Sequence, residues 1–272
     1  MNLAAKTTQV DKSGDRVRDM FAQIAPRYDT MNHLLSLGID IHWRKSAVRK
    51  LRIEGSLPIL DCCTGTGDLA LMLAKRVEGR GIDVVGTDFC APMIDLAQKK
   101  HHAKYPNLSV RFFEADSQSL PFDDGAFQLV TVAFGLRNVQ DTEKGLREMV
   151  RVCAAGGQLA VLEFSQPSAP GLSQLYQAYF RHILPRVGQA LAKNSQSAYA
   201  YLPNSVIQFP SGKAFASLME HVGLANIKIF PLTLGIATLY LGDASKSEAS
   251  GEFLAASTSC TASESDASAE DH

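Results

Sequence analysis

The chain has 272 residues, of which 46% are hydrophobic, and its formal net charge is −1 at pH 7. This apolar content is sufficient for the core of one large α/β domain. No run of about eighteen uncharged apolar residues is present, which argues against a membrane-spanning helix. The five cysteines form no C-x-x-C pair, so the sequence indicates neither a metal site nor a disulfide framework.

The N-terminal residues 1–14 are polar and lack the apolar core of a signal peptide. We expect a flexible segment there and a cytoplasmic protein. Residues 15–50 are predicted to form helices, because apolar side chains recur at helical spacing. Trp43, the single tryptophan, is expected to anchor their packing.

Strands and helices alternate through the middle of the chain. Apolar runs predict strands at 58–62, 82–88, 109–115, 127–133 and 157–163, with helices at 67–77, 91–103 and 141–151 between them. This alternation predicts a parallel sheet with right-handed crossovers and helices on both faces. The two closing strands, at 226–232 and 236–241, are joined by too few residues for a crossover, so the seventh strand should run antiparallel.

Two further segments differ from this pattern. Residues 168–210 interrupt the alternation after the fifth strand and are rich in apolar and aromatic side chains. We expect them to form a helical cap, and plain core packing is the alternative. Residues 243–272 carry eight serines, seven acids and one base, a composition typical of a disordered tail. The tail holds a charge of −6, which leaves residues 1–242 with +5 from 26 bases and 21 acids. A mildly basic body is compatible with an anionic membrane surface.

The glycine-rich segment after the first strand is the strongest functional signal. Asp61 ends that strand, and Gly65, Thr66 and Gly67 form the turn into the next helix. Glycine lets backbone amides approach a ligand closely, and Asp88 at the end of the second strand lies where a ribose would present its hydroxyls. The pattern indicates a nucleoside cofactor, while a tight turn without a ligand is the simpler alternative.

Two cofactors are compatible with this loop. The spacing satisfies the looser dinucleotide fingerprint, with alanine at its third glycine position. Acids around the loop suit a cationic sulfonium better than a pyrophosphate, which favours S-adenosylmethionine over NAD. The sheet with its final hairpin is likewise the arrangement of class I, Rossmann-like methyltransferases, whose ligands bind at the carboxyl ends of the first strands.

Side chains after the third and fourth strands fall at this same edge. Asp116 and Ser117 are predicted to hold the adenine, although Asp116 capping a turn is the alternative. The fourth strand ends in Ala133 and continues as Phe-Gly-Leu-Arg-Asn to Asn138. The [N/D]-P-P-[Y/F] motif of amino-nitrogen methyltransferases is absent there, and no Pro-Cys pair indicates 5-methylcytosine chemistry. We therefore expect no nucleic-acid partner.

The chain resembles the ubiquinone/menaquinone biosynthesis C-methyltransferases from about residue 17 to 242. The segments that carry the resemblance are Met20-Phe21-x-x-Ile24-Ala25-x-x-Tyr28-Asp29-x-Met31-Asn32, Leu37-Gly38-x-Asp40-x-x-Trp43-Arg44, residues 61–68, residues 134–138, Leu162-Glu163-Phe164-Ser165-Gln166-Pro167 and Tyr201-Leu202-x-x-Ser205 with Phe209-Pro210. Two departures are Thr64, where one branch has glycine, and Ala133, where a serine often contacts the cofactor.

This resemblance implies methylation of a ring carbon of a polyprenylated quinol, with S-adenosylmethionine as the cofactor. Demethylmenaquinol is the expected acceptor, and a methoxy-benzoquinol is the alternative. A substrate of this kind implies peripheral contact with the inner face of the membrane, and the sequence leaves a homo-oligomer open. Asp61, Gly65, Thr66, Gly67, Asp88, Asp116, Ser117 and Ala133 are the expected cofactor residues.

An aromatic carbon attacks a sulfonium methyl well only when a neighbouring hydroxyl is deprotonated, so the site needs a base or an anion stabiliser. Arg137 is a poor base, and we expect its guanidinium to stabilise the phenolate while Asn138 orients the ring oxygen. Tyr28 and His33 come from the N-terminal helices. His33 is a candidate proton acceptor, with a structural histidine as the alternative.

Two other functions remain open at this point. One is an NAD-dependent oxidoreductase on the same sheet. The other is a methyltransferase-like scaffold of a quinone-synthesis complex, which would bind the cofactor without turnover.

Overall fold

A computed structural model describes residues 12–167 and 196–245. Seven strands form one sheet in the order β3-β2-β1-β4-β5-β7-β6. Their bounds are β1 Ile59–Cys62, β2 Val84–Asp88, β3 Val110–Glu114, β4 Phe127–Ala133, β5 Cys153–Phe164, β6 Leu224–Leu232 and β7 Ala237–Ala244. Every residue of β1 and β2 is buried, as expected for central strands covered on both faces.

The sheet has the predicted mixture of directions. Strands β1 to β5 pair in parallel, whereas β7 runs antiparallel between β5 and β6. The register of β5 and β7 joins Gln158 to Asp243 at one end and Phe164 to Ala237 at the other. This insertion follows from the short connection between the last two strands, which leaves no room for a crossover helix.

Three strands are longer than the sequence predicts, namely β5, β7 and β6, which begins at Leu224. β5 begins at Cys153 because an irregularity between Phe127 and Leu129 lets it pair with β4 before the main ladder starts. β7 continues to Ala244, and the Asp243 carboxylate forms an ion pair with Arg52 at 2.8 Å. The strand thus extends two residues into the predicted acidic tail, and residues 246–272 lie outside the described part of the chain.

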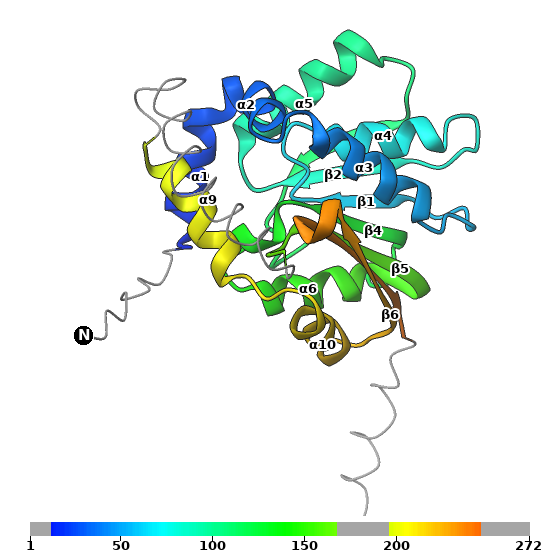
Figure 1. Cartoon of the computed structure of the whole chain (residues 1–272). Coiled ribbons are helices and arrows are strands. Elements are labelled where there is room, and N and C mark those ends of the chain that lie inside the picture. The colour runs from blue at the N-terminus through cyan, green and yellow to red at the C-terminus, as the bar shows by residue number, and fades with distance from the viewer. Residues whose placement is uncertain (1–11, 168–195, 246–272) are drawn as a thin grey trace, which may run out of the picture.

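Helices cover both faces of the sheet (Figure 1). α3 (Ile39–Lys50), α4 (Asp68–Arg76) and α5 (Ala91–Lys104) lie over one face, and α6 (Thr142–Val152) and α10 (Lys213–His221) lie over the other. Two separate buried clusters correspond to these layers. Trp43 and Leu73 belong to the first cluster, and Met149, Phe215 and Tyr240 belong to the second.

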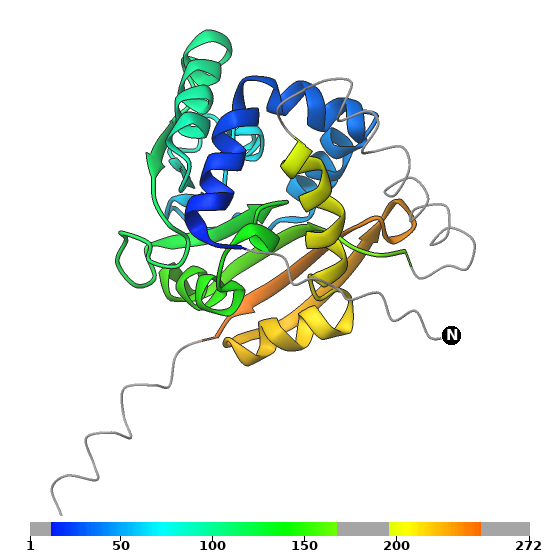
Figure 2. The same cartoon turned by 90° about the vertical axis from the view of Figure 1, so that its left-hand side faces the viewer.

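The remaining helices gather at the end of the sheet where the parallel strands terminate (Figures 1 and 2). They are α1 (Gly14–Ile24), the 3-10 turn η1 (Ala25–Arg27), α2 (Tyr28–Leu35) and α9 (Gln196–Gln208). Val17 and Met20 of α1 pack against Tyr201 of α9, which joins the N-terminal helices to the inserted segment. Of the predicted cap at 168–210, residues 168–195 lie outside the described part of the chain, as do residues 1–11.

No helix within the described ranges is both long enough and apolar enough to cross a membrane.

Candidate active site

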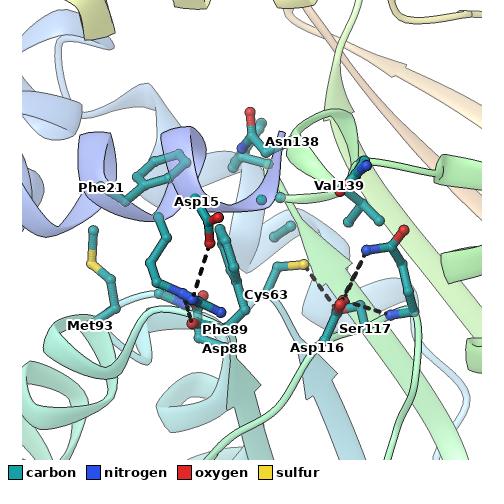
Figure 3. A pocket seen from close by; sticks show the side chains of 18 of the residues that line it. Asp15, Phe21, Cys63, Asp88, Phe89, Met93, Asp116, Ser117, Asn138 and Val139 are labelled. Atoms are coloured by element: carbon teal, nitrogen blue, oxygen red, sulfur yellow. Dashed lines mark hydrogen bonds and ion pairs between the residues drawn. The ribbon is translucent and has the colours of Figure 1, made fainter. Parts of the chain in front are cut away.

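A pocket lies between the carboxyl ends of the strands and helix α1 (Figure 3). Seven of the predicted site residues line it. They come from helix α2, from the last residues of β2 and β4, and from the segments after β1, β3 and β4: Tyr28, Gly65, Asp88, Asp116, Ser117, Ala133 and Asn138. Segments that lie far apart in the sequence therefore converge on one cavity, as expected at the carboxyl edge of a doubly wound sheet.

The loop after β1 depends on left-handed backbone positions. Cys63, Gly65 and Gly67 all have positive φ, at 49°, 56° and 82°. A Cβ on Gly67 would lie 2.9 Å from the ring of Phe112 and 3.1 Å from Ala97, so only glycine fits there. Gly67 thus lets the loop turn sharply into α4 and keeps that helix close to the sheet.

Asp88 joins this loop to the second strand. The backbone N–H of Gly65 donates to Asp88 Oδ2 at 2.9 Å, and the N–H of Cys90 donates to Oδ1 at 3.0 Å. Burial raises the pKa of Asp88 to about 6, although these backbone donors act in the opposite direction. The carboxyl borders the pocket, so a ligand that donates hydrogen bonds to it would favour its ionised form.

Asp61 is buried behind the loop and does not border the pocket. Its carboxylate accepts hydrogen bonds from the hydroxyls of Thr64 at 2.6 Å and Thr131 at 2.7 Å. Burial raises its pKa to about 6 as well, against the effect of these donors. Asp61 therefore fastens the glycine loop to the ends of β1 and β4.

Thr66 takes part in an ion-pair network on the outer side of the loop. Its hydroxyl donates to Asp29 Oδ1 at 2.5 Å and accepts from Lys100 Nζ at 3.0 Å. Lys100 also forms ion pairs with Asp29 at 2.6 Å and with Asp68 at 2.7 Å. This network holds α2 and α5 against the glycine loop, and the hydroxyl of Thr66 is engaged in it.

The loops after β3 and β4 complete the lining of the pocket. The backbone N–H of Gln118 donates to Asp116 Oδ1 at 2.9 Å, and Ser117 Oγ lies 3.3 Å from Cys63 Sγ. The Asp116 carboxylate thus caps its own turn and also borders the pocket. After Ala133, Phe134 has a positive φ of 58°, which turns the chain back toward the pocket.

Arg137 and Asn138 follow on the short 3-10 turn η2 (Leu136–Asn138), and both are buried. The Arg137 guanidinium donates from Nη1 to Glu163 Oε1 at 2.8 Å and to the carbonyl oxygen of Phe134. Its Nε and the Oδ1 of Asn138 are buried with no hydrogen-bond partner among the described residues. Such orphaned groups are rare, and a donor and an acceptor on adjacent residues form a natural place for a ligand hydroxyl.

Tyr28 and His33 occupy different environments on α2. Tyr28 borders the pocket, and burial raises the pKa of its phenol. His33 does not border the pocket, and its Nδ1 contacts Asp40 Oδ2 at 2.9 Å. Asp40 also accepts from Arg44 Nη1 at 2.5 Å, so His33 belongs to a polar cluster at the junction of α2 and α3.

Several lining residues come from α1 and were read in the sequence only as parts of an N-terminal helix. Asp15, Arg18 and Phe21 border the pocket, and Arg18 Nε donates to the carbonyl oxygen of Phe89 at 3.2 Å. The Arg18 guanidinium also lies over the Phe89 ring, 5.7 Å from its centroid. Figure 3 shows Asp15 and Phe21 on the helix that closes this side of the cavity. A helical apolar pattern alone does not reveal which side of a helix closes a pocket.

Comparison with known proteins decides the family. The family model described as the ubiE/COQ5 methyltransferase family matches residues 8–244. The chain belongs to this family.

Curated relatives of the chain agree with this assignment. A ubiquinone/menaquinone biosynthesis C-methyltransferase UbiE of Geobacter sp. (strain M21) is 45% identical over 233 residues, which cover 86% of the chain and 98% of the relative. A demethylmenaquinone methyltransferase of Thermus thermophilus is 47% identical over 224 residues, with 82% and 99% covered. The predicted family is confirmed, and the chain is a C-methyltransferase of the ubiE/COQ5 family.

Solved structures confirm the predicted fold class. A SAM-dependent methyltransferase of Thermotoga maritima, described as a possible histamine N-methyltransferase, has a TM-score of 0.60 at 19% identity, with 84% of this chain and 99% of that chain covered. The phosphoethanolamine N-methyltransferase 2 of Haemonchus contortus, solved with S-adenosyl-L-methionine, has a TM-score of 0.55 at 11% identity, with 75% and 53% covered. At these identities the likeness concerns the fold.

The cofactor of this ubiE/COQ5 methyltransferase is S-adenosylmethionine, as predicted, and the charges of the pocket fit it. Three carboxylates border the pocket, from Asp15, Asp88 and Asp116, against one base, Arg18. An acidic lining attracts a cationic sulfonium and an ammonium group and repels a pyrophosphate. The NAD alternative therefore has no support in the lining residues.

The network around Lys100 predicts a stability effect. We expect Lys100→Met to lower the free energy of unfolding by about 1–2 kcal/mol, because Asp29 and Asp68 lose a shared cation while part of each carboxylate is exposed. Affinity for S-adenosylmethionine should fall as well, since α2 carries Tyr28 into the pocket. Thermal unfolding and calorimetric titration measure these two quantities.

Lys99→Met is the matched control, because Lys99 is exposed on the same helix. An equal loss of stability in both variants would show that the network does not hold the loop.

Proposed function

We propose that this protein transfers a methyl group from S-adenosylmethionine to a ring carbon of a polyprenylated quinol, converting demethylmenaquinol to menaquinol. The observation that carries the proposal is the orphaned pair of Arg137 Nε and Asn138 Oδ1 in a member of this family. Asn138 lines the cofactor pocket, and Arg137, the residue before it, does not itself border the pocket. Relatives at 47% and 44% identity bear the name demethylmenaquinone methyltransferase, which favours the naphthoquinol over the benzoquinol.

S-adenosylmethionine supplies an electrophilic methyl group on a positively charged sulfur. In our proposal Asp88 accepts hydrogen bonds from the ribose, and Asp116 with Ser117 holds the adenine. Gly65 and Ala133 offer backbone at the pocket wall, where no long side chain obstructs the cofactor. Asp61, Thr66 and Gly67 act behind them by fixing the loop, as their hydrogen bonds and backbone angles support.

The acceptor ring needs a hydroxyl that becomes an oxyanion as its neighbouring carbon attacks. Arg137 Nε donates to that oxygen in our proposal, and the fixed positive charge favours the phenolate over the phenol. Before ionisation, Asn138 Oδ1 accepts a hydrogen bond from the hydroxyl and so orients the ring. Burial raises the pKa of the Tyr28 phenol, which suits Tyr28 as a neutral hydrogen-bond donor at the pocket wall.

The acceptor hydroxyl must lose its proton before attack. The methylated ring carbon then loses its hydrogen as the ring becomes aromatic again and the oxygen regains a proton, so one proton is released in total. The two candidates that take it up are solvent and His33. The His33 contact with Asp40 would fix the proton of a neutral imidazole on Nδ1 and leave Nε2 as the basic nitrogen. That arrangement suits a proton acceptor. Because His33 does not border the pocket, the proton would reach it indirectly.

The first test is methyl transfer from labelled S-adenosylmethionine to short-chain demethylmenaquinol and to the matching methoxy-benzoquinol, under reducing conditions. We expect methylation of demethylmenaquinol and a kcat about 100-fold lower for Arg137→Lys, which lacks the Nε donor. Methylation of the benzoquinol alone would show that the acceptor belongs to the ubiquinone series. Cofactor binding without transfer to either quinol would contradict the proposal and favour a scaffold.

The pKa of Asp88 predicts a pH dependence of cofactor binding. In the free protein this pKa is about 6, raised by burial, so Asp88 takes up a proton as the pH falls through 6. A ligand that requires the ionised form must then displace this proton, and the Kd of S-adenosylmethionine should rise about tenfold between pH 7 and pH 5. Isothermal titration calorimetry across this range measures it.

The Asp88→Asn variant should bind S-adenosylmethionine more weakly than the wild type at pH 7, and its Kd should lose most of this pH dependence. Asp61→Asn removes the other carboxyl with a pKa of about 6 and should retain the dependence, because Asp61 does not border the pocket. A wild-type Kd that stays constant over the range would contradict a role for ionised Asp88.

A polyprenylated acceptor resides in a bilayer, and we propose peripheral contact through α3. The exposed side chains of this helix include Lys45, Arg49 and Lys50, while its one acid, Asp40, is buried. Leu37 lies in the turn before α3 and has 82% of its surface exposed. A basic helix beside an exposed apolar residue is typical of surfaces that bind anionic lipid.

Vesicle flotation tests this contact. The wild-type protein should float with phosphatidylcholine vesicles that contain phosphatidylglycerol and remain behind without it. The double variant Lys45→Glu/Arg49→Glu should lose flotation, whereas Lys99→Glu/Lys104→Glu on α5 should keep it. Equal flotation of both double variants would show that α3 is not the contact face.

A further inference from the structure

Glu163 is a buried carboxylate beside the acceptor side of the site, in a segment to which the sequence pattern gave no role. It lies near the end of β5 and is fully buried. Its Oε1 accepts from Arg137 Nη1 at 2.8 Å and from the backbone N–H of Phe164 at 2.9 Å, and its Oε2 accepts from the backbone N–H of Arg137 at 3.3 Å. Both oxygens are thus occupied by donors.

These contacts fix the Arg137 guanidinium from several directions. Nη1 also donates to the carbonyl oxygen of Phe134, and the guanidinium lies over the ring of Phe164, 5.2 Å from its centroid. With Nη1 held and one face covered, the direction of the Nε–H bond is determined. Nε is buried and has no hydrogen-bond partner among the described residues.

We infer that Glu163 is a positioning residue for methyl transfer. It holds Arg137 by Nη1 so that Nε, with Asn138 Oδ1, forms a donor–acceptor pair for one hydroxyl of the acceptor ring. This inference rests on the proposed function for its acceptor. It adds a residue that never touches the substrate and acts through Arg137.

Glu163 is not suited to be the base itself. A base must release its hydrogen-bond donors to take a proton, and here three donors from the protein occupy both carboxylate oxygens. A purely stabilising role is also a weak explanation, because a buried ion pair is often no more stabilising than a well-packed apolar pair. What the carboxylate supplies, and an apolar side chain would not, is a fixed orientation of the guanidinium.

Other charged groups lie near the Glu163–Arg137 ion pair, and one of them, Arg44, provides a reference for the experiment. Lys12 interacts electrostatically with both Glu163 and Arg137. Burial lowers the pKa of Lys12, and the charge of Glu163 opposes this effect. Arg44 and Asp40 form a second buried ion pair at 2.5 Å, on α3. The Arg44 guanidinium stacks on Phe134, and Phe134 in turn stacks on Phe164, with 4.6 Å between the ring centroids. Arg44 is therefore a matched internal reference for Arg137.

The test combines a double-mutant cycle with NMR of the arginine Nε–H groups. Glu163→Asp keeps the charge, which protects folding, but withdraws the carboxylate by one methylene. We expect its kcat to fall about 10- to 100-fold with a KM for the quinol near the wild-type value, since a misplaced donor acts mainly on the transition state. When Glu163→Asp is added to Arg137→Lys, kcat should fall by less than about twofold further, because both changes remove the same oriented donor.

The NMR readout does not depend on turnover. In the wild type, the Nε–H signals of Arg137 and Arg44 should both be sharp and slow to exchange with solvent. In Glu163→Asp the Arg137 signal should broaden or exchange quickly, while the Arg44 signal stays unchanged.

The outcomes separate this inference from the proposed function. A wild-type enzyme that methylates no quinol overturns the proposed function, and the Arg137 signal still decides whether Glu163 holds the guanidinium. A kcat within about twofold of wild type in Glu163→Asp, fully additive effects in the cycle, or an unchanged Arg137 signal would each overturn the positioning role. Broadening of the Arg44 signal to the same extent would indicate general loosening of the fold and also count against it.

Discussion

The hydrogen bond from the Gly65 amide to Asp88 is the contact on which the cofactor side depends. It joins the loop after β1 to the end of β2, and it brings a buried carboxylate to the edge of the pocket. Asp61 fastens the same loop from behind, and Gly67 lets α4 begin without a clash. The site therefore combines a costly burial of negative charge with a backbone that only glycine can follow, and a ligand with donors and positive charge relieves that cost.

Much of this arrangement could be predicted because it is encoded locally. Buried parallel strands read as continuous apolar runs, and the short link around Gly235 requires an antiparallel final strand. Asp88 ends β2 and Asp116 lies two residues after β3, so their place at the carboxyl edge follows once the sheet is known. The early start of β5 at Cys153 was missed, because it results from an irregular register with β4 and not from a local pattern.

Other parts of the site depend on contacts between distant segments. Arg18 reaches the carbonyl oxygen of Phe89, 71 residues away, and Glu163 reaches Arg137 across 26 residues. The hydrophobic periodicity of the sequence does not predict these two contacts. The sequence identified Thr66 by its position between two glycines, but its hydroxyl is turned toward Asp29 and Lys100, and that direction becomes visible only when α2 and α5 are in place.

The charges of the two halves of the site match the two reactants. Asp15, Asp88 and Asp116 line the pocket, which suits a cation, whereas the buried guanidinium of Arg137 serves the acceptor in the proposed mechanism. Glu163 forms an ion pair with that guanidinium at 2.8 Å, so the proposed acceptor site would hold a neutral quinol in preference to a free anion. Charge that develops on the ring oxygen would nevertheless meet an oriented N–H donor at short range, where the low dielectric strengthens the interaction. In the proposed mechanism, an arginine that is fixed and paired with a carboxylate would therefore favour the transition state more than either bound reactant.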